Sequence, residues 1–195
     1  MPWPKKPRFI FTSNGFSVLE IFKVWTALKV EQGTPYFIGQ HGNNFGTHAW
    51  MGNSKCPEQT TGDKFITWGW KEGENKIPAF VLTNAGRKPR QFDKAGSLLL
   101  IECPLIRISH YHDACHEFAF FMEEQFRFVE NLPEHIHQKL TVRLHANYLG
   151  MRTFEDVRWK DRSPHTKIEP GVINIGKLIK QSRLVVHSYD STGIL

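Results

Sequence analysis

Three segments of the chain carry side chains suited to acid–base chemistry or to anion binding, and each segment follows a run of β-forming residues. The side chains concerned are His41, Arg143, His145, Ser188, Ser191 and Thr192. Imidazole can take up a proton near neutral pH, whereas hydroxyls and free backbone N–H groups at the start of a helix bind phosphate in α/β proteins. The sequence therefore predicts a base in the first part of the chain and a phosphate site in the second.

The first segment is a turn made of Gly39, Gln40, His41, Gly42, Asn43 and Asn44. Between two glycines, His41 can sit on a tight turn at the carboxyl end of a strand, where open α/β sheets place their ligands. There it would suit a general base that deprotonates an acceptor hydroxyl. Other roles stay open: the turn could bind phosphate or an acceptor sugar, or His41 could only hydrogen-bond its own loop. The two asparagines tolerate left-handed turn geometry and could be present for that reason.

The last segment, from Ser182 to Leu195, is typical of a buried strand that leads through a hydroxyl-rich turn into a helix. Ser191 and Thr192 would then contact a phosphate, or they would only cap the helix. Arg107 and Ser109, just past an earlier strand, are also placed for phosphate contact.

A run of histidines and a cysteine, from His110 to His116, is a candidate metal site because zinc accepts both residue types. Its spacing matches no usual structural zinc pattern, and the adjacent Cys115 and His116 cannot easily close on one ion together with the upstream histidines. We expect a solvated loop that leads into a helix, with no metal and no other cofactor.

The elements that must position these side chains alternate between strand and helix. In the first part, strands are expected at residues 8–12, 35–39 and 63–70, and a helix at 18–32. In the second part, strands are expected at 97–102, 140–145 and 183–187, and helices at 116–131 and 172–181. This alternation predicts parallel sheets with right-handed crossovers. The fold class is therefore α/β, with two Rossmann-like lobes, both incomplete.

The polar stretch from 71 to 96, around one strand-like piece at 77–82, separates the two parts. We assign residues 1–75 to the C-terminal part of a first lobe, 76–96 to the connection between the lobes, and 97–195 to the N-terminal part of a second lobe. A complete lobe uses roughly 150 residues, so we expect a fragment of a longer protein.

Two groups of aromatic and apolar residues are expected to pack. Helical spacing predicts a buried stripe from Phe118, Phe121, Met122, Phe126, Val129 and Leu132. Trp68 and Trp70 could stack on a sugar, but a tryptophan pair at a strand end is more often part of the packing.

Composition restricts the class of protein. With 40% hydrophobic residues the chain can bury a core, and its net charge of +6 suits an anionic partner. The basic residues are scattered, so nucleic acid is not expected as that partner. No segment reaches the ~18 apolar residues of a membrane span, and the 3 cysteines show no C-x-x-C spacing. We expect a cytoplasmic location, with any membrane association peripheral and at the inner face.

Four motifs follow one another along the chain: Ile38–Gly46, Thr67–Trp70, Val142–His145 and Ser182–Thr192. In this order they resemble bacterial surface-carbohydrate biosynthesis transferases with a two-lobed GT-B-type fold. Capsule, teichoic-acid and Kdo transferases would be more distant relatives. The resemblance extends over nearly the whole chain, from Phe9 to Leu195.

The resemblance implies that the first lobe is the acceptor side and that the second lobe binds the donor, a nucleotide-linked sugar. Arg143 and His145 would neutralise its phosphates, and Ser188, Ser191 and Thr192 would donate hydrogen bonds to them. Preorganised donors of this kind stabilise a departing nucleotide diphosphate without a metal. The expected reaction transfers the sugar to a saccharide or lipid-linked saccharide acceptor of a surface polysaccharide, with His41 as the base.

Two other functions fit the same residues. A non-catalytic module could bind nucleotides or polyanions, with an affinity that falls steeply with salt. A phosphotransferase could move a polyol phosphate from a nucleotide carrier. The donor, the acceptor, the stereochemistry and the oligomeric state depend on pocket shape and are not specified by these motifs.

Overall fold

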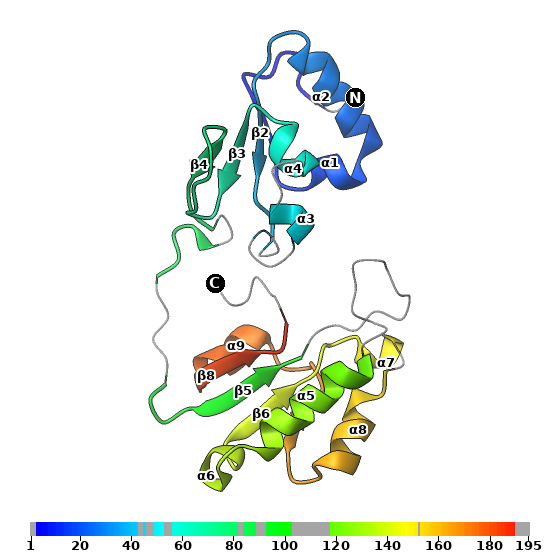
Figure 1. Cartoon of the computed structure of the whole chain (residues 1–195), viewed down its shortest axis with the longest axis vertical. Helices are drawn as coiled ribbons and strands as arrows, with labels where there is room; N and C mark the ends of the chain where they lie inside the picture. Colours follow the sequence, from blue (N-terminus) through cyan, green and yellow to red (C-terminus); the bar gives the residue numbers. More distant parts are fainter. Residues whose placement is uncertain are drawn as a thin grey trace. The chain divides into compact units, whose positions relative to one another are not determined.

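The computed structural model describes residues 3–42, 45, 49–52, 56–81, 84–88, 93–102, 118–151 and 153–189. The chain divides into two compact units, the first up to Lys88 and the second up to Tyr189. Each unit contains a four-stranded sheet in which every recorded strand pair is parallel (Figure 1). The predicted α/β class with two Rossmann-like sheets is confirmed.

In the first unit, the strands are β1 (Ile10–Thr12), β2 (Tyr36–Gly39), β3 (Lys64–Thr67) and β4 (Lys76–Pro78), and the helices are α1 (Gly15–Val18), α2 (Glu20–Val30), α3 (Ala49–Gly52) and α4 (Pro57–Thr60). The strands lie side by side in sequence order. β4 forms one edge of this sheet, so residues 76–78 lie within it, although the sequence pattern placed them in the connection between lobes.

The helix predicted over residues 18–32 corresponds to α2, which begins at Glu20 and ends at Val30, and the short helix α1 that precedes it was not predicted. Leu19 has an extended backbone, with φ −123° and ψ 91°, and separates α1 from α2. Phe22 and Trp25 on α2 pack against the core of this unit, which includes Ile10, Tyr36, Ile38 and Phe65 from the strands. The helices thereby cover the sheet face that carries these side chains.

In the second unit, the strands are β5 (Ser97–Ile101), β6 (Leu140–Arg143), β7 (Lys167–Glu169) and β8 (Ser182–His187), and the helices are α5 (Phe118–Glu130), α6 (Glu134–His137), α7 (Tyr148–Met151), α8 (Glu155–Arg162) and α9 (Ile175–Lys180). Their order across the sheet is β7-β6-β5-β8. The chain thus winds outward from β5 to β7 and then returns to the other side of β5. Doubly wound folds bind ligands outside the carboxyl ends of the strands at such a reversal, which here lies between β5 and β8.

The core of the second unit lies between the sheet and α5. Met122, Phe126 and Val129 are buried there, so the predicted stripe is confirmed for these residues. The sequence patterns missed α8 and β7, yet Trp159 on α8 is fully buried and packs edge-to-face on Phe126 with ring centroids 4.7 Å apart.

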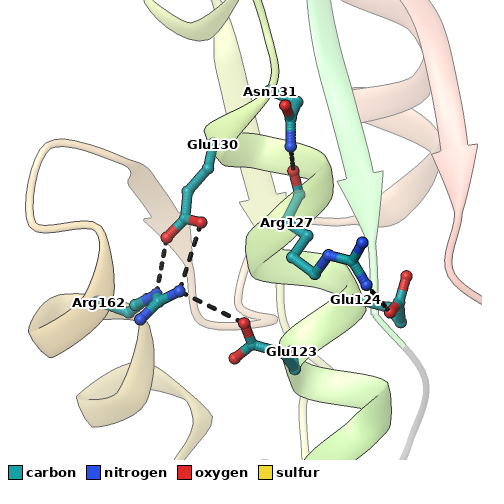
Figure 2. A network of polar contacts seen from close by, with 6 residues as sticks. All are labelled: Glu123, Glu124, Arg127, Glu130, Asn131 and Arg162. Carbon is teal, nitrogen blue, oxygen red and sulfur yellow. Dashed lines mark hydrogen bonds and ion pairs between the residues drawn. The ribbon is translucent and has the colours of Figure 1, made fainter.

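Charged side chains join α8 to α5 on the surface (Figure 2). Arg162 Nε donates to Glu130 Oε1 at 2.7 Å, and its Nη2 lies 3.4 Å from Glu123 Oε1. These side chains are 41 to 51% exposed, so water screens the pairs and each contributes little. Among the described residues, no helix combines the length and the apolar content needed to cross a membrane.

Candidate functional site

The turn that follows β2 is organised by Gln40, which is buried. Its Nε2 donates to the carbonyl oxygen of Gly42 at 2.8 Å. Its Oε1 accepts hydrogen bonds from the backbone N–H of Trp68 at 2.9 Å and from the indole N–H of Trp70 at 2.8 Å. One amide side chain therefore joins the turn after β2 to the turn after β3, and it places the intervening His41.

Trp70 is a packing residue in this structure. Its ring lies 6.1 Å from the ring of Phe65 and 6.4 Å from that of Phe45, measured between centroids. Its indole N–H is held by Gln40. The sequence favoured packing over sugar stacking for the tryptophan pair, and the contacts of Trp70 agree with it.

His41 lies two residues after Gly39, which is the last residue of β2. The side chain of His41 is 33% exposed. Its Nδ1 lies 3.5 Å from Oε2 of Glu58 on α4, and the ring of Phe45 meets its ring edge-on. Burial raises the pKa of the Glu58 carboxyl, while the charge of His41 opposes that rise. No sequence pattern pointed to Glu58, because its approach to His41 depends on how α4 packs on the sheet.

In the second unit, the carboxyl ends of three strands meet at one edge. The backbone N–H of Glu102 donates to the carbonyl of Arg143 at 3.0 Å, and the N–H of Ser188 donates to the carbonyl of Ile101 at 3.1 Å. The motifs at Arg143–His145 and His187–Ser188 thus flank β5 on its two sides. These two motifs therefore lie at the same end of the sheet, where the strands reach their carboxyl ends.

Arg143 is engaged within the protein. It pairs in register with Glu169 on β7, and its Nε lies 3.5 Å from Glu169 Oε2. Its Nη1 donates to the carbonyl of Leu144 at 3.2 Å. The side chains of Arg143 and Glu169 are only 13% and 6% exposed, so much of the arginine is covered.

Glu169 also fills a ring of backbone amides in the loop after β7. Its Oε1 accepts from the N–H groups of Val172 and Ile173 at 2.8 and 2.9 Å, and its Oε2 accepts from Gly171 at 3.1 Å. Successive backbone N–H groups of this kind form anion-binding nests. Here the anion is a side chain of the protein itself, and no sequence pattern pointed to it.

His145 and Ser188 differ in the hydrogen bonds that their side chains can still make to a ligand. His145 Nδ1 accepts from the backbone N–H of Asn147 at 3.3 Å, so the neutral ring carries its proton on Nε2 and can donate it. The Ser188 hydroxyl donates to the carbonyl of Ile101 at 3.0 Å. The hydroxyl oxygen of Ser188 can still accept, whereas its hydrogen is used at the end of the strand.

Glu102 lies between these motifs and is buried. Burial raises the pKa of its carboxyl to about 8, and the charge of Glu155 adds to that rise, while the hydrogen bond from Trp159 opposes it. Perturbed carboxyl groups cluster at functional sites. A single glutamate at the end of an apolar run gave no such signal in the sequence.

Comparison with known proteins identifies the chain. The model of the LIC12162 family transferases matches residues 1–195. The chain belongs to this family. No curated protein matches it.

For this LIC12162 family transferase, part of the predicted site lies outside the described residues: Asn43, Asn44, Arg107, Ser109, Ser191, Thr192 and the whole run from His110 to His116. Within the described ranges, no three histidine, cysteine or acidic side chains gather in a way that could hold a metal ion. Among the described residues, the first unit contributes His41 and Glu58, and the second contributes Arg143, His145 and Ser188.

Proposed function

We propose that this transferase moves a sugar from a nucleotide-activated donor to a hydroxyl of a saccharide or lipid-linked saccharide acceptor, with a GT-B-type pair of lobes. The observation that carries the proposal is the accessible imidazole of His41 at the carboxyl end of β2. A base at that place suits the activation of an acceptor hydroxyl.

In the proposed step, His41 Nε2 takes the proton of the acceptor hydroxyl while the acceptor oxygen bonds to the anomeric carbon. The bond from that carbon to the diphosphate oxygen breaks, and its electron pair leaves with the nucleotide diphosphate. The sugar is then on the acceptor, and the proton on His41 passes to water. No change of oxidation state occurs.

The second unit is proposed to stabilise the negative charge of the leaving diphosphate. His145 supports this role because its Nε2 is free to donate. Arg143 and Ser188 lie at the ends of the strands on the two sides of β5, and the charge of Arg143 is already paired with Glu169. Arg107, Ser109, Ser191 and Thr192 complete the proposed set of phosphate contacts. Donors fixed before the reaction stabilise such charge without reorganisation, and no metal is required.

The experiment measures the release of nucleoside diphosphate from UDP-, GDP- and dTDP-linked sugars. His41→Ala and His145→Ala should each lower the rate by about 100-fold or more. His135→Ala is the matched control, since His135 is an exposed histidine on α6 and lies outside the proposed site. Wild-type rates in both variants, or binding of all these donors without turnover, would overturn the proposal.

The products separate the proposal from phosphotransfer. Sugar transfer releases a nucleoside diphosphate, because the bond from carbon to oxygen breaks. Transfer of a polyol phosphate from a CDP-linked polyol would release a nucleoside monophosphate, because a bond from phosphorus to oxygen breaks. Release of the monophosphate alone would replace the first reaction by the second.

A further inference from the structure

Glu58 and His41 face each other across two elements of the first unit. Glu58 Oε2 lies 3.5 Å from His41 Nδ1, and the glutamate side chain is the more buried of the two, at 13% against 33% exposed. Pro57 begins α4 and places Glu58 in its first turn. The contact therefore depends on the position of α4 against β2.

The neighbours of Glu58 hold α4 in place. Gln59 is buried, its side chain donates to the carbonyl of Met51, and its own carbonyl accepts from Asn75 Nδ2 at 3.0 Å. Gly62 follows α4 so closely against β2 that an added Cβ would lie 3.1 Å from Ile38 Cγ1. Glu58 thus projects from a backbone that is fixed on both sides.

The carboxylate oxygen nearest His41 is otherwise unsatisfied. Within the described residues, Glu58 Oε2 is buried without a hydrogen-bond partner. A buried acceptor left unpaired is costly, and the cost is recovered if a donor is supplied. The Nδ1–H of His41 is such a donor, and catalytic contacts that are long in the free enzyme tighten in the complex.

The geometry points to Glu58 as a positioning residue that keeps the proton of His41 on Nδ1 and so leaves Nε2 as the base. This inference rests on the proposed role of His41. The carboxylate selects the tautomer, orients the ring and stabilises the imidazolium that forms after proton transfer. In the described part of the first unit, the charged side chain that contacts the His41 ring is Glu58. Phe45 makes an apolar contact with the same ring.

The test reads the imidazole directly and does not depend on turnover. Long-range ¹H–¹⁵N spectra of the ¹⁵N-labelled protein report the tautomer of His41. The wild type should carry the proton on Nδ1. Glu58→Gln should keep that tautomer, because the amide oxygen can still accept a hydrogen bond from Nδ1–H. Glu58→Ala should lose the preference for Nδ1.

Activity gives the second readout. Glu58→Ala should lower kcat by about 10- to 100-fold with little change in KM, and Glu58→Asp should restore part of it. Glu20→Gln is the matched control, because Glu20 pairs with Lys23 on the surface of α2 in the same unit.

Different results would overturn the role of Glu58 and the role of His41. An unchanged tautomer of His41 in folded Glu58→Ala would overturn the inference about Glu58, whatever the rates. A full spectroscopic response together with wild-type transfer in His41→Ala would support the contact and overturn only the proposed base. Thermal melts of each variant establish that it is folded.

Discussion

Trp159 donates its indole N–H to Oε1 of Glu102 at 2.7 Å, and this bond joins α8 to the carboxyl end of β5. Both residues are buried, and within the described residues the second carboxyl oxygen of Glu102 has no partner. Because burial raises the pKa of Glu102 to about 8, its carboxyl is mostly neutral near pH 7. The contact between α8 and the end of β5 is then a hydrogen bond between two uncharged groups.

The pH dependence of stability should reveal this carboxyl. The folded pKa is about 8 against a usual value of 4.5, so between these values the folded protein keeps a proton that the unfolded chain has released. The free energy of unfolding of the second unit should therefore fall by a few kcal/mol as pH rises through this window, and level off above it. Glu102→Gln should remove most of that slope.

Urea titrations at several pH values measure this effect, with Glu124→Gln as the control at an exposed site of the same unit. An equal slope in the wild type and in Glu102→Gln would contradict the assignment.

Gly171 and Gly33 have nearly equal left-handed backbones, with φ of 82° and 85°, but different surroundings. A Cβ at Gly171 would lie 2.4 Å from Ala146 Cα, whereas nothing lies within 4 Å of one at Gly33. Gly33→Ala should cost about 1 kcal/mol from backbone strain alone. Gly171→Ala should cost about 3 kcal/mol or more, because the loop must also move. Hydrogen exchange of β6 and β2 measures each loss in its own unit, and equal losses would refute the prediction.

Gln40 should contribute strongly to the free energy of unfolding of the first unit. Gln40→Ala removes three hydrogen bonds and leaves the N–H groups of Trp68 and Trp70 unpaired. We expect a loss of about 2–4 kcal/mol. Gln32→Ala, at an exposed glutamine bonded to Lys29, should cost less than about 0.5 kcal/mol. Tryptophan fluorescence during urea unfolding compares the two variants, and a similar small loss in both would show that Gln40 does not hold the turns.

Arg162 should contribute little despite its several contacts. Arg162→Ala removes the exposed pairs with Glu123 and Glu130 and a contact over the ring of Phe126. The loss should be about 1 kcal/mol or less and should shrink in high salt. Urea titrations at low and high salt test this, and a loss of several kcal/mol that salt does not change would contradict it.

The elements that the sequence predicted are those with a clear period. Buried positions recur at helical spacing in α5, and the β-branched residues of β8 end at His187 as expected. α8 was missed because Glu155–Arg162 contains only two apolar residues, Val157 and Trp159, which is too few to define a helical face. α1 was missed because Gly15–Val18 is only about one turn long, which is too short to show a helical period.

For the candidate site, the sequence predicted the residues at strand ends but not the carboxylates that contact them. Strand ends could be located from hydrophobic runs, so His41, His145 and Ser188 lie where the pattern placed them. Their carboxylate neighbours could not be found this way. Glu58, Glu102 and Glu169 owe their roles to packing between elements that are distant in sequence, and single glutamates of this kind do not stand out among the 19 acidic residues of the chain.

Glu169 supplies the loop after β7 with its own counter-ion. Its carboxylate balances Arg143 and occupies three amides before any ligand is present. This part of the second unit is thus close to electrically neutral, and it attracts a distant anion only weakly. Any electrostatic attraction that speeds the binding of an anion must come from the other charged residues of the chain, whose net charge is +6. Salt should consequently slow the arrival of an anion without loosening this loop, because the pair that holds it is shielded from water.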